Sequence, residues 1–289
     1  MDHSKEFGKI KKFMKNPNVR EYILSNLRKS MAILGHSKEF IKDLDEFFNT
    51  IDVEKFTKKY NKDLIKFNTM GWVQVMEPRN FERHVLPNIP PTRKLLDIGC
   101  GTGILLHILQ KSKSIKGLVG IDIDPYPEWK EYRNEKLTLE VVKPQQFDDF
   151  LKNCGADGIV MTWVLHHMEF DEQEKYLKQI YKSFDKITLT ILEDTYSDIK
   201  PLTEDIGANK EFKKLTSKEK MMALSVNDWF ANRPLLQRMV EPIPFTYRTM
   251  EDWEILFKKV GFKIKKSEYI GFPKDRDVNN PQGLFVIEK

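Results

Sequence analysis

The feature that most constrains this chain is a glycine-rich segment, Asp97-x-Gly99-x-Gly101-x-Gly103. It follows a short apolar run, residues 94–98, that is typical of a buried strand, and it precedes a helical pattern over residues 104–110. Glycine permits positive φ angles and lets a ligand approach the backbone closely. A strand, a glycine turn and a helix in this order predict a cofactor site beside the helix N-terminus.

Beyond residue 93, apolar runs of strand length alternate with helical stretches. The expected strands cover residues 94–98, 117–124, 137–142, 158–163, 186–192, 261–264 and 283–287. The clearest helices between them cover residues 104–110, 172–184 and 251–260. Such alternation predicts an α/β fold built from parallel βαβ units with right-handed crossovers.

Two regions depart from this alternation. Residues 4–60 carry helical periodicity with no catalytic motif, and residues 195–245 form a helical insertion. We therefore expect an N-terminal helical cap or lid over residues 1–90, and an α/β domain over residues 91–289 that contains the insertion.

An acidic residue supports the cofactor site. Asp122 lies 19 residues after Gly103, at the end of the next expected strand. A carboxylate there can accept hydrogen bonds from both hydroxyls of a ribose, although a turn or helix-capping role is the alternative. No Lys-Ser/Thr pair follows the glycines, so a P-loop is disfavoured.

Several segments together resemble the class I S-adenosylmethionine-dependent methyltransferase superfamily. Residues 95–103 are similar to its first motif, and residues 120–124 to its second strand. Residues 164–168, Val-Leu-His-His-Met, resemble the segment after its fourth strand, and residues 247–262 resemble its closing helix and strand. The resemblance implies a Rossmann-like, mostly parallel sheet of seven strands with helices on both faces and an antiparallel last strand.

The same resemblance implies S-adenosyl-L-methionine as the cofactor and assigns residues to it. The loop of Gly99, Cys100, Gly101 and Gly103 would face its methionine and ribose parts, and Asp97 would support the ammonium group. Asp122 would hold the ribose. Ile123 would pack on the adenine ring, and Gln145 or Gln146 would accept a hydrogen bond from its amino group. Trp163, after the fourth expected strand, is expected to form a wall for the cofactor or the substrate.

Methyl acceptor and cofactor should meet at the carboxyl ends of the strands. His166 or His167 could serve there as a general base, although such a histidine can also pack or cap the next helix. Glu193 is the third catalytic candidate, and Asp194 could orient a substrate hydroxyl or amine; a turn or cap is again the alternative. No ligand spacing requires a metal, so none is expected, although His167 with these two acids would suit a divalent ion.

The insertion is expected to lie over the pocket and supply polar recognition. Its candidates are Asn227, Asp228, Trp229, Asn232 and Arg233. Arg233 could bind a carboxylate or phosphate in bidentate fashion, or lie in a helix–helix contact. Tyr60, Trp72 and Arg79 of the N-terminal part would form the opposite wall of a lid that excludes water.

Composition narrows the partners. The formal net charge of +5 comes from 48 Lys and Arg against 43 Asp and Glu, with much of the excess in scattered surface lysines. A small-molecule acceptor is therefore favoured over nucleic acid, which needs a clustered basic patch. A non-catalytic S-adenosylmethionine-binding protein is a third reading. Two cysteines, a polar N-terminus and no long apolar run predict a cytoplasmic protein without a membrane span. We expect a monomer or a homodimer.

Overall fold

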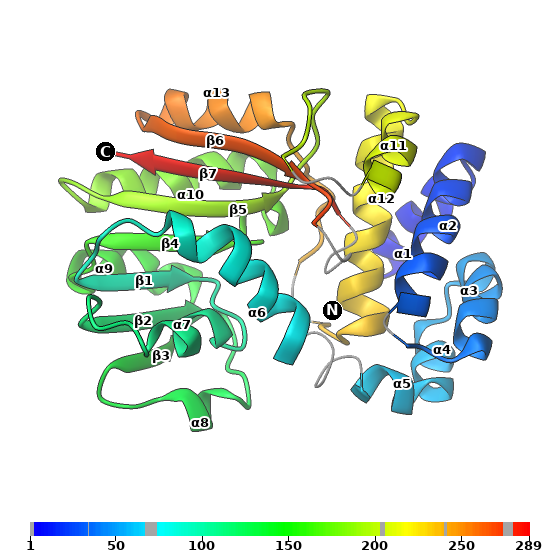
Figure 1. The fold of residues 1–289 in the computed structure, drawn as a ribbon, viewed down its shortest axis with the longest axis horizontal. Coiled ribbons are helices and arrows are strands. Elements are labelled where there is room, and N and C mark those ends of the chain that lie inside the picture. Colours follow the sequence, from blue (N-terminus) through cyan, green and yellow to red (C-terminus); the bar gives the residue numbers. More distant parts are fainter. Residues whose placement is uncertain (1–2, 34, 67–73, 203–205, 240–241, 274–279) are drawn as a thin grey trace.

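In the computed structural model, the protein has a seven-stranded sheet with a separate layer of helices at one end (Figure 1). The structure describes residues 3–33, 35–66, 74–202, 206–239, 242–273 and 280–289. The strands are β1 Lys94–Ile98, β2 Gly117–Asp122, β3 Leu137–Val141, β4 Gly158–Thr162, β5 Thr188–Asp194, β6 Lys263–Gly271 and β7 Gln282–Glu288.

The strand order is β3-β2-β1-β4-β5-β7-β6, with β7 antiparallel to both of its neighbours and the remaining pairs parallel. This confirms the predicted fold class: a mostly parallel, Rossmann-like sheet of seven strands. The order reverses between β1 and β4. Ligands of open α/β sheets bind at such a switch point, outside the carboxyl ends of the strands.

Both faces of the sheet are covered, and the strand sequences explain why. Neighbouring residues of a strand point to opposite faces, so Leu95 joins one hydrophobic cluster and Leu96 the other. The helices that flank the sheet are α6 Glu77–Asn80, α7 Ile104–Leu109, α8 Trp129–Tyr132, α9 Phe147–Asn153, α10 Phe170–Ser183 and α13 Met250–Val260. Short helical segments complete this layer: η2 Phe81–Val85, η3 Leu86–Asn88, η4 Pro144–Gln146 and η5 Leu165–His167. Strands buried on both faces read as continuous apolar runs, which is the pattern seen in the sequence.

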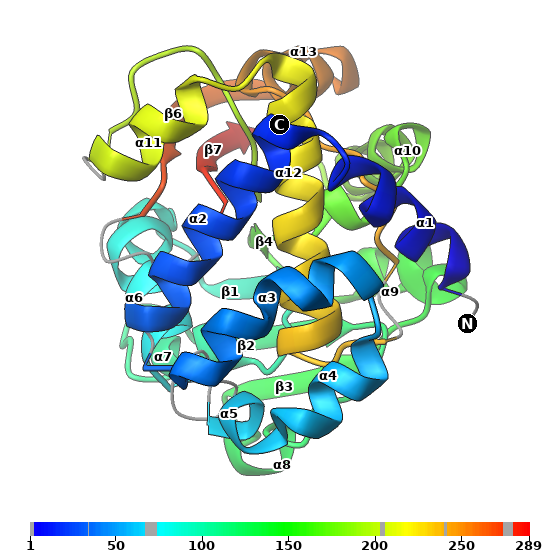
Figure 2. The same ribbon diagram turned by 90° about the vertical axis from the view of Figure 1, so that its right-hand side faces the viewer.

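A helical cap covers the carboxyl ends of the parallel strands (Figure 2). Its N-terminal helices are α1 Ser4–Phe13, α2 Pro17–Ile33, α3 Lys38–Thr50, α4 Val53–Lys59 and α5 Asn61–Lys66. The insertion adds α11 Ile206–Lys213, α12 Ser217–Phe230 and the π-helical η6 Ala231–Leu235. The cap is thus built from two distant parts of the chain.

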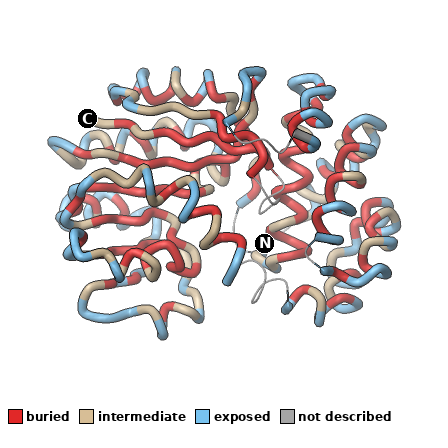
Figure 3. The backbone as a smooth tube through the Cα atoms, in the orientation of Figure 1, coloured by how far each residue is buried: buried red, intermediate tan, exposed pale blue. Residues whose placement is uncertain are grey.

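Helix α12 is the centre of this cap. It is buried along most of its length (Figure 3), and it packs against both α1 and α2. Trp229 and Phe230 of α12 form ring contacts with Phe47 of α3 at centroid distances of 5.9 and 5.8 Å. An aromatic core of this kind fixes α12 against the N-terminal helices.

The end of β5 differs from the sequence expectation in a way that matters for the site. Strand β5 continues to Asp194, two residues further than expected, because its antiparallel pairing with β7 extends to Gln282. Glu193 and Asp194 therefore lie within the strand end and not in a turn beyond it.

None of the described helices is long and apolar enough to cross a membrane.

Candidate active site

A pocket of about 510 Å³ lies between the carboxyl ends of the strands and the cap. It is lined from below by the ends of β1, β2, β4 and β5, and from above by residues of α2, α12 and η6. Its volume falls in the range of pockets that enclose small molecules and cofactors.

The glycine loop forms one wall of this pocket. Gly99 and Cys100 donate their backbone N–H groups to the Ile121 carbonyl, at 2.8 and 3.0 Å. Gly101 donates its N–H to Asp122 Oδ2 at 2.9 Å, and all three loop residues line the pocket. Gly103 lies outside the lining; at a φ of +83° it begins α7, so its role is to set the turn.

Two carboxylates flank this loop. Asp122 also accepts the N–H of Ile123 at 2.7 Å, which holds its carboxylate at the pocket wall. Asp97 is 1% exposed, and its Oδ1 has no hydrogen-bond partner among the described residues. Burial, reinforced by the charges of Asp122 and Glu77, raises the pKa of Asp97 well above its ordinary value. A buried acceptor of this kind demands a donor, and a ligand ammonium group would supply one.

The end of the pocket near β3 is apolar. Ile123, Val142, Pro144 and Phe147 line it, which suits the face of an aromatic base. Gln145 and Gln146, which were predicted to contact adenine, do not line the pocket. The reason is local: Gln146 Oε1 accepts the N–H of Lys143 at 3.1 Å and caps η4, and Gln145 is exposed.

The segment after β4 enters the pocket with a strained residue. Trp163 lines the pocket, and its backbone has a φ of +57°, a left-handed conformation that residues other than glycine seldom adopt. Its ring packs on that of Phe81, with the two centroids 5.6 Å apart. Its N–H donates to the Leu192 carbonyl at 2.8 Å, which holds the turn. Strain of this kind collects at functional sites, where it fixes how the following residues are presented.

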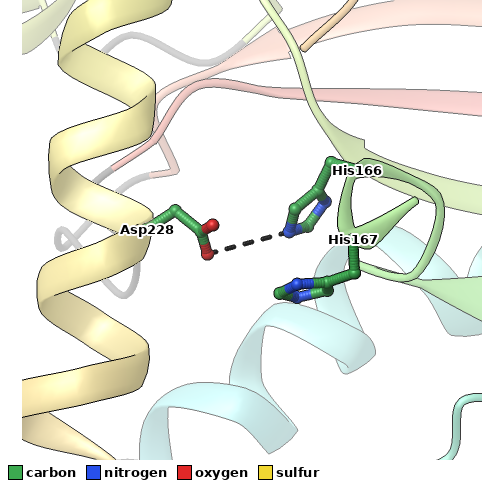
Figure 4. A group of neighbouring side chains, drawn as sticks. All are labelled: His166, His167 and Asp228. Atoms are coloured by element: carbon green, nitrogen blue, oxygen red, sulfur yellow. Dashed lines mark ion pairs between the residues drawn. The ribbon is translucent and has the colours of Figure 1, made fainter. Parts of the chain in front are cut away.

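His166 lies between two carboxylates in the buried interior (Figure 4). Its Nδ1 lies 2.7 Å from Glu193 Oε2, and its Nε2 lies 3.8 Å from Asp228 Oδ1. Burial opposes protonation of His166, but the two carboxylates outweigh it and raise the pKa well above its ordinary value. Burial alone would raise the pKa of Asp228, but its interaction with His166 outweighs burial and lowers this pKa to about 2.

Glu193 lies behind His166 and does not line the pocket. Its Oε1 accepts the backbone N–H groups of Val164 and Leu165 at 2.9 and 2.6 Å. Glu193 was predicted to be catalytic, but its place in the structure is that of a positioning residue. It orients the His166 ring and the segment that carries it.

His167 and Asp194 both line the pocket. His167 Nδ1 lies 2.8 Å from the Pro242 carbonyl oxygen, which can only accept, so Nδ1 carries the proton. Asp194 accepts a hydrogen bond from Asn280 at 2.5 Å. Burial raises the pKa of Asp194 to about 7, despite the opposing effects of His166 and Asn280.

Three residues that were predicted to contact the substrate, Tyr60, Trp229 and Arg233, do not line the pocket. Tyr60 is 4% exposed in the cap core and donates to Asp43, while Trp229 is fully buried against Phe7 and Phe47. Arg233 forms an ion pair with Glu6. These side chains face away from the pocket because the cap needs its own core; Trp72 lies outside the described residues.

Several pocket residues were not predicted. Glu77 of α6 and Asn280 before β7 are buried and polar, and Met31 of α2 brings the N-terminal helices into the lining. Burial raises the pKa of Glu77 to about 7. No sequence motif surrounds these positions, and only the pairing of distant elements brings them together.

Comparisons with known proteins find several methyltransferases that are similar to this chain. The chain is 30% identical over 112 residues to a small RNA 2'-O-methyltransferase of Xenopus tropicalis, covering 34% of this chain and 30% of that protein. It is 27% identical over 127 residues to an uncharacterized methyltransferase of Oceanobacillus iheyensis, covering 42% and 57%. Both matches span less than two thirds of these relatives. A SAM-dependent methyltransferase structure from Archaeoglobus fulgidus superposes with a TM-score of 0.51 at 13% identity, covering 79% of this chain and 99% of that chain.

The fold and the glycine loop are consistent with the class I methyltransferase superfamily. The model of the methyltransferase domain family matches residues 73–267, more than half of the chain, and the chain belongs to this family.

Proposed function

We propose that the enzyme binds S-adenosylmethionine along β1 and β2 and methylates a small molecule enclosed beneath the cap. The observation that carries this proposal is the pocket of about 510 Å³ between the cap and the strand ends. A pocket covered by α12 and η6 suits an acceptor small enough to fit beneath the cap. Covering the acceptor removes water from the reacting groups.

The proposed cofactor placement follows the donors and acceptors of the pocket. The unpartnered oxygen of Asp97 receives the methionine ammonium, and Asp122 receives the ribose hydroxyls. The apolar end with Ile123 and Phe147 holds the adenine. When bound, the cofactor supplies a methyl group on a positively charged sulfur.

The acceptor would lie between this methyl group and the far end of the pocket. That end carries His166, His167, Asp194 and Asp228, with Asn280 beside them. These residues orient a polar group by hydrogen bonds, and the indole of Trp163 screens it from solvent. Alignment and desolvation are the main demands of an in-line methyl displacement.

The make-up of the lining favours a small molecule over a nucleic acid. Six carboxylate residues, Glu77, Asp97, Asp122, Glu172, Asp194 and Asp228, occur among the described lining residues, against Lys175 and Arg238. Phosphate groups of a nucleic acid bind where Lys and Arg cluster, and the described lining residues offer no such cluster.

A radiolabel assay tests the proposal. The protein is incubated with methyl-tritiated S-adenosylmethionine and with one of two fractions: a metabolite extract below about 1 kDa or total small RNA. The size limit is about that of a molecule that a pocket of several hundred Å³ can hold. We expect labelled product from the small-molecule fraction alone. Label in the RNA fraction, with salt-dependent RNA binding, would instead support an RNA methyltransferase, the alternative that the Xenopus tropicalis relative raises.

Label in neither fraction, together with tight cofactor binding, would point to the third reading, a binding protein that does not transfer the methyl group. That outcome would contradict the proposed activity and leave the proposed cofactor site in place.

A further inference from the structure

Two histidines and one carboxylate meet at the acceptor end of the pocket. His166 and His167 belong to η5, after β4, and Asp228 belongs to α12 of the cap (Figure 4). One donor atom from each residue lies within 4.8 Å of the other two, and all three residues line the pocket. No metal was expected from the sequence. The group of possible metal ligands considered there, His167 with Glu193 and Asp194, differs from the group that the fold brings together.

The hydrogen bonds of both imidazoles are those of metal-ligating histidines. His167 Nδ1 donates to the Pro242 carbonyl at 2.8 Å, and His166 Nδ1 faces the Glu193 carboxylate at 2.7 Å. Each ring therefore carries a proton on Nδ1, which leaves Nε2 as the atom that faces a metal ion. At His166 the metal ion would take the place of the Nε2 proton. Histidines that bind metals almost always donate their second N–H to a carboxylate or a backbone carbonyl.

The carboxylate is oriented in the same manner. Asp228 Oδ2 accepts the Tyr247 hydroxyl at 2.6 Å, and its Oδ1 accepts from Asn232 Nδ2 at 2.7 Å. Asp228 and Glu193 thus place two carboxylates around one imidazole in a buried region. Such an arrangement requires a cation, and either a proton on His166 or a metal ion satisfies it.

We propose that His166 Nε2, His167 Nε2 and an oxygen of Asp228 bind a divalent transition-metal ion at the acceptor end of the pocket. Two imidazoles and one carboxylate suit ions such as Zn²⁺, Mn²⁺, Fe²⁺ and Co²⁺. Bonds of about 2.0–2.2 Å to such an ion bring the donor atoms to roughly 3–3.5 Å from one another, so the side chains need only a small closing movement.

The role of the ion rests on the proposed function, whereas its binding does not. Coordination positions that protein leaves open face the pocket and can take an acceptor hydroxyl, whose pKa the ion lowers. The hydroxyl proton leaves to solvent, and the oxygen lone pair forms the new O–C bond to the methyl group. The C–S bond breaks, and its electron pair stays on sulfur in S-adenosylhomocysteine. The site therefore favours an oxygen acceptor.

Metal binding can be measured without a substrate. The full chain, freed of any polyhistidine tag and dialysed against EDTA, is titrated with Co²⁺ and followed by its visible d–d absorption, with Zn²⁺ calorimetry in parallel. We expect one saturable equivalent. His167→Ala and Asp228→Asn should each weaken binding at least tenfold, and Glu193→Gln, which alters only the orientation of His166, should weaken it about 10- to 100-fold.

Two controls separate a lost site from a lost fold. His84→Gln removes a partly buried imidazole of η2 outside the pocket and should bind Co²⁺ as the parent does. Retained S-adenosylhomocysteine binding by His167→Ala shows that the cofactor site is formed, whatever happens to the metal. The proposal is overturned if the parent shows no saturable Co²⁺ or Zn²⁺ binding, or if His167→Ala and Asp228→Asn bind as tightly as the parent; His166 is then a buried imidazolium between two carboxylates.

Discussion

Glu6 and Arg233, which are 227 positions apart in the sequence, form a bidentate ion pair that ties α1 to η6. Arg233 Nε and Nη2 donate to the two carboxylate oxygens of Glu6 at 3.0 and 2.8 Å. The Arg233 side chain is fully buried and that of Glu6 is 17% exposed. The pair joins the N-terminal helices to the insertion, and both parts together form the roof of the pocket.

Glu6→Gln is expected to destabilise the protein by about 3 kcal/mol, because it leaves a buried guanidinium without its compensating charge. Urea unfolding measures this free energy. Asp45→Asn is the matched control: Asp45 pairs with Arg20 and Arg28, but its side chain is 46% exposed, so the cost should stay below about 1 kcal/mol. Equal effects of the two changes would contradict the structural role given to Glu6.

Gly99→Ala is expected to disrupt the cofactor loop. The residue has a φ of +71°, and an added Cβ would lie 2.5 Å from Val164 Cγ2, so strain and overpacking combine to cost about 2–4 kcal/mol. Gly8→Ala is the control, since nothing lies within 4 Å of its Cβ position in α1; it should raise stability by about 0.5–1 kcal/mol. Thermal unfolding compares the two, and an unchanged melting temperature for Gly99→Ala would refute the packing described here.

Glu77 makes stability depend on pH. Burial is the main cause that raises its pKa from 4.5 to about 7, with a smaller contribution from Glu128 and an opposing one from Arg238. The folded state therefore binds the proton more tightly than the unfolded state between these values, and stability is lost as the pH rises through this window.

Glu77→Gln removes this titration and keeps the shape of the side chain. The free energies of unfolding of parent and variant should agree near pH 4.5, and the variant should be more stable by about 2–3 kcal/mol at pH 8. Denaturant unfolding at several pH values measures the difference. A constant difference across the pH range would show that Glu77 does not titrate as described.

The sheet could be predicted from the sequence because each strand carries its own local pattern. Leu95 and Leu96 occur in a continuous apolar run that only a strand covered on both faces would need, and the loop Gly99–Gly103 indicated where the pocket lies. His166 and His167 could be placed at the pocket because they directly follow β4, and the pocket lies at the carboxyl ends of the parallel strands.

The cap could not be predicted at the level of single residues. Helix α12 is buried around most of its circumference, so nothing in its sequence told which side faces the pocket. Trp229 and Asp228 are neighbours in the chain, yet Trp229 packs into the cap core and Asp228 reaches His166. That choice depends on how α1–α4 pack against α12, which is tertiary information.

Binding of S-adenosylhomocysteine, measured by calorimetry, tests the central claim most directly. The parent is expected to bind one equivalent, and Asp122→Ala to bind at least tenfold more weakly, because it loses charged hydrogen bonds to the ribose worth about 1.5–3 kcal/mol each. Asp124→Ala, two residues away, outside the pocket lining and paired with Lys143, should bind as the parent does. The absence of binding by the parent, or equal affinities of Asp122→Ala and the parent, would contradict the proposed cofactor site.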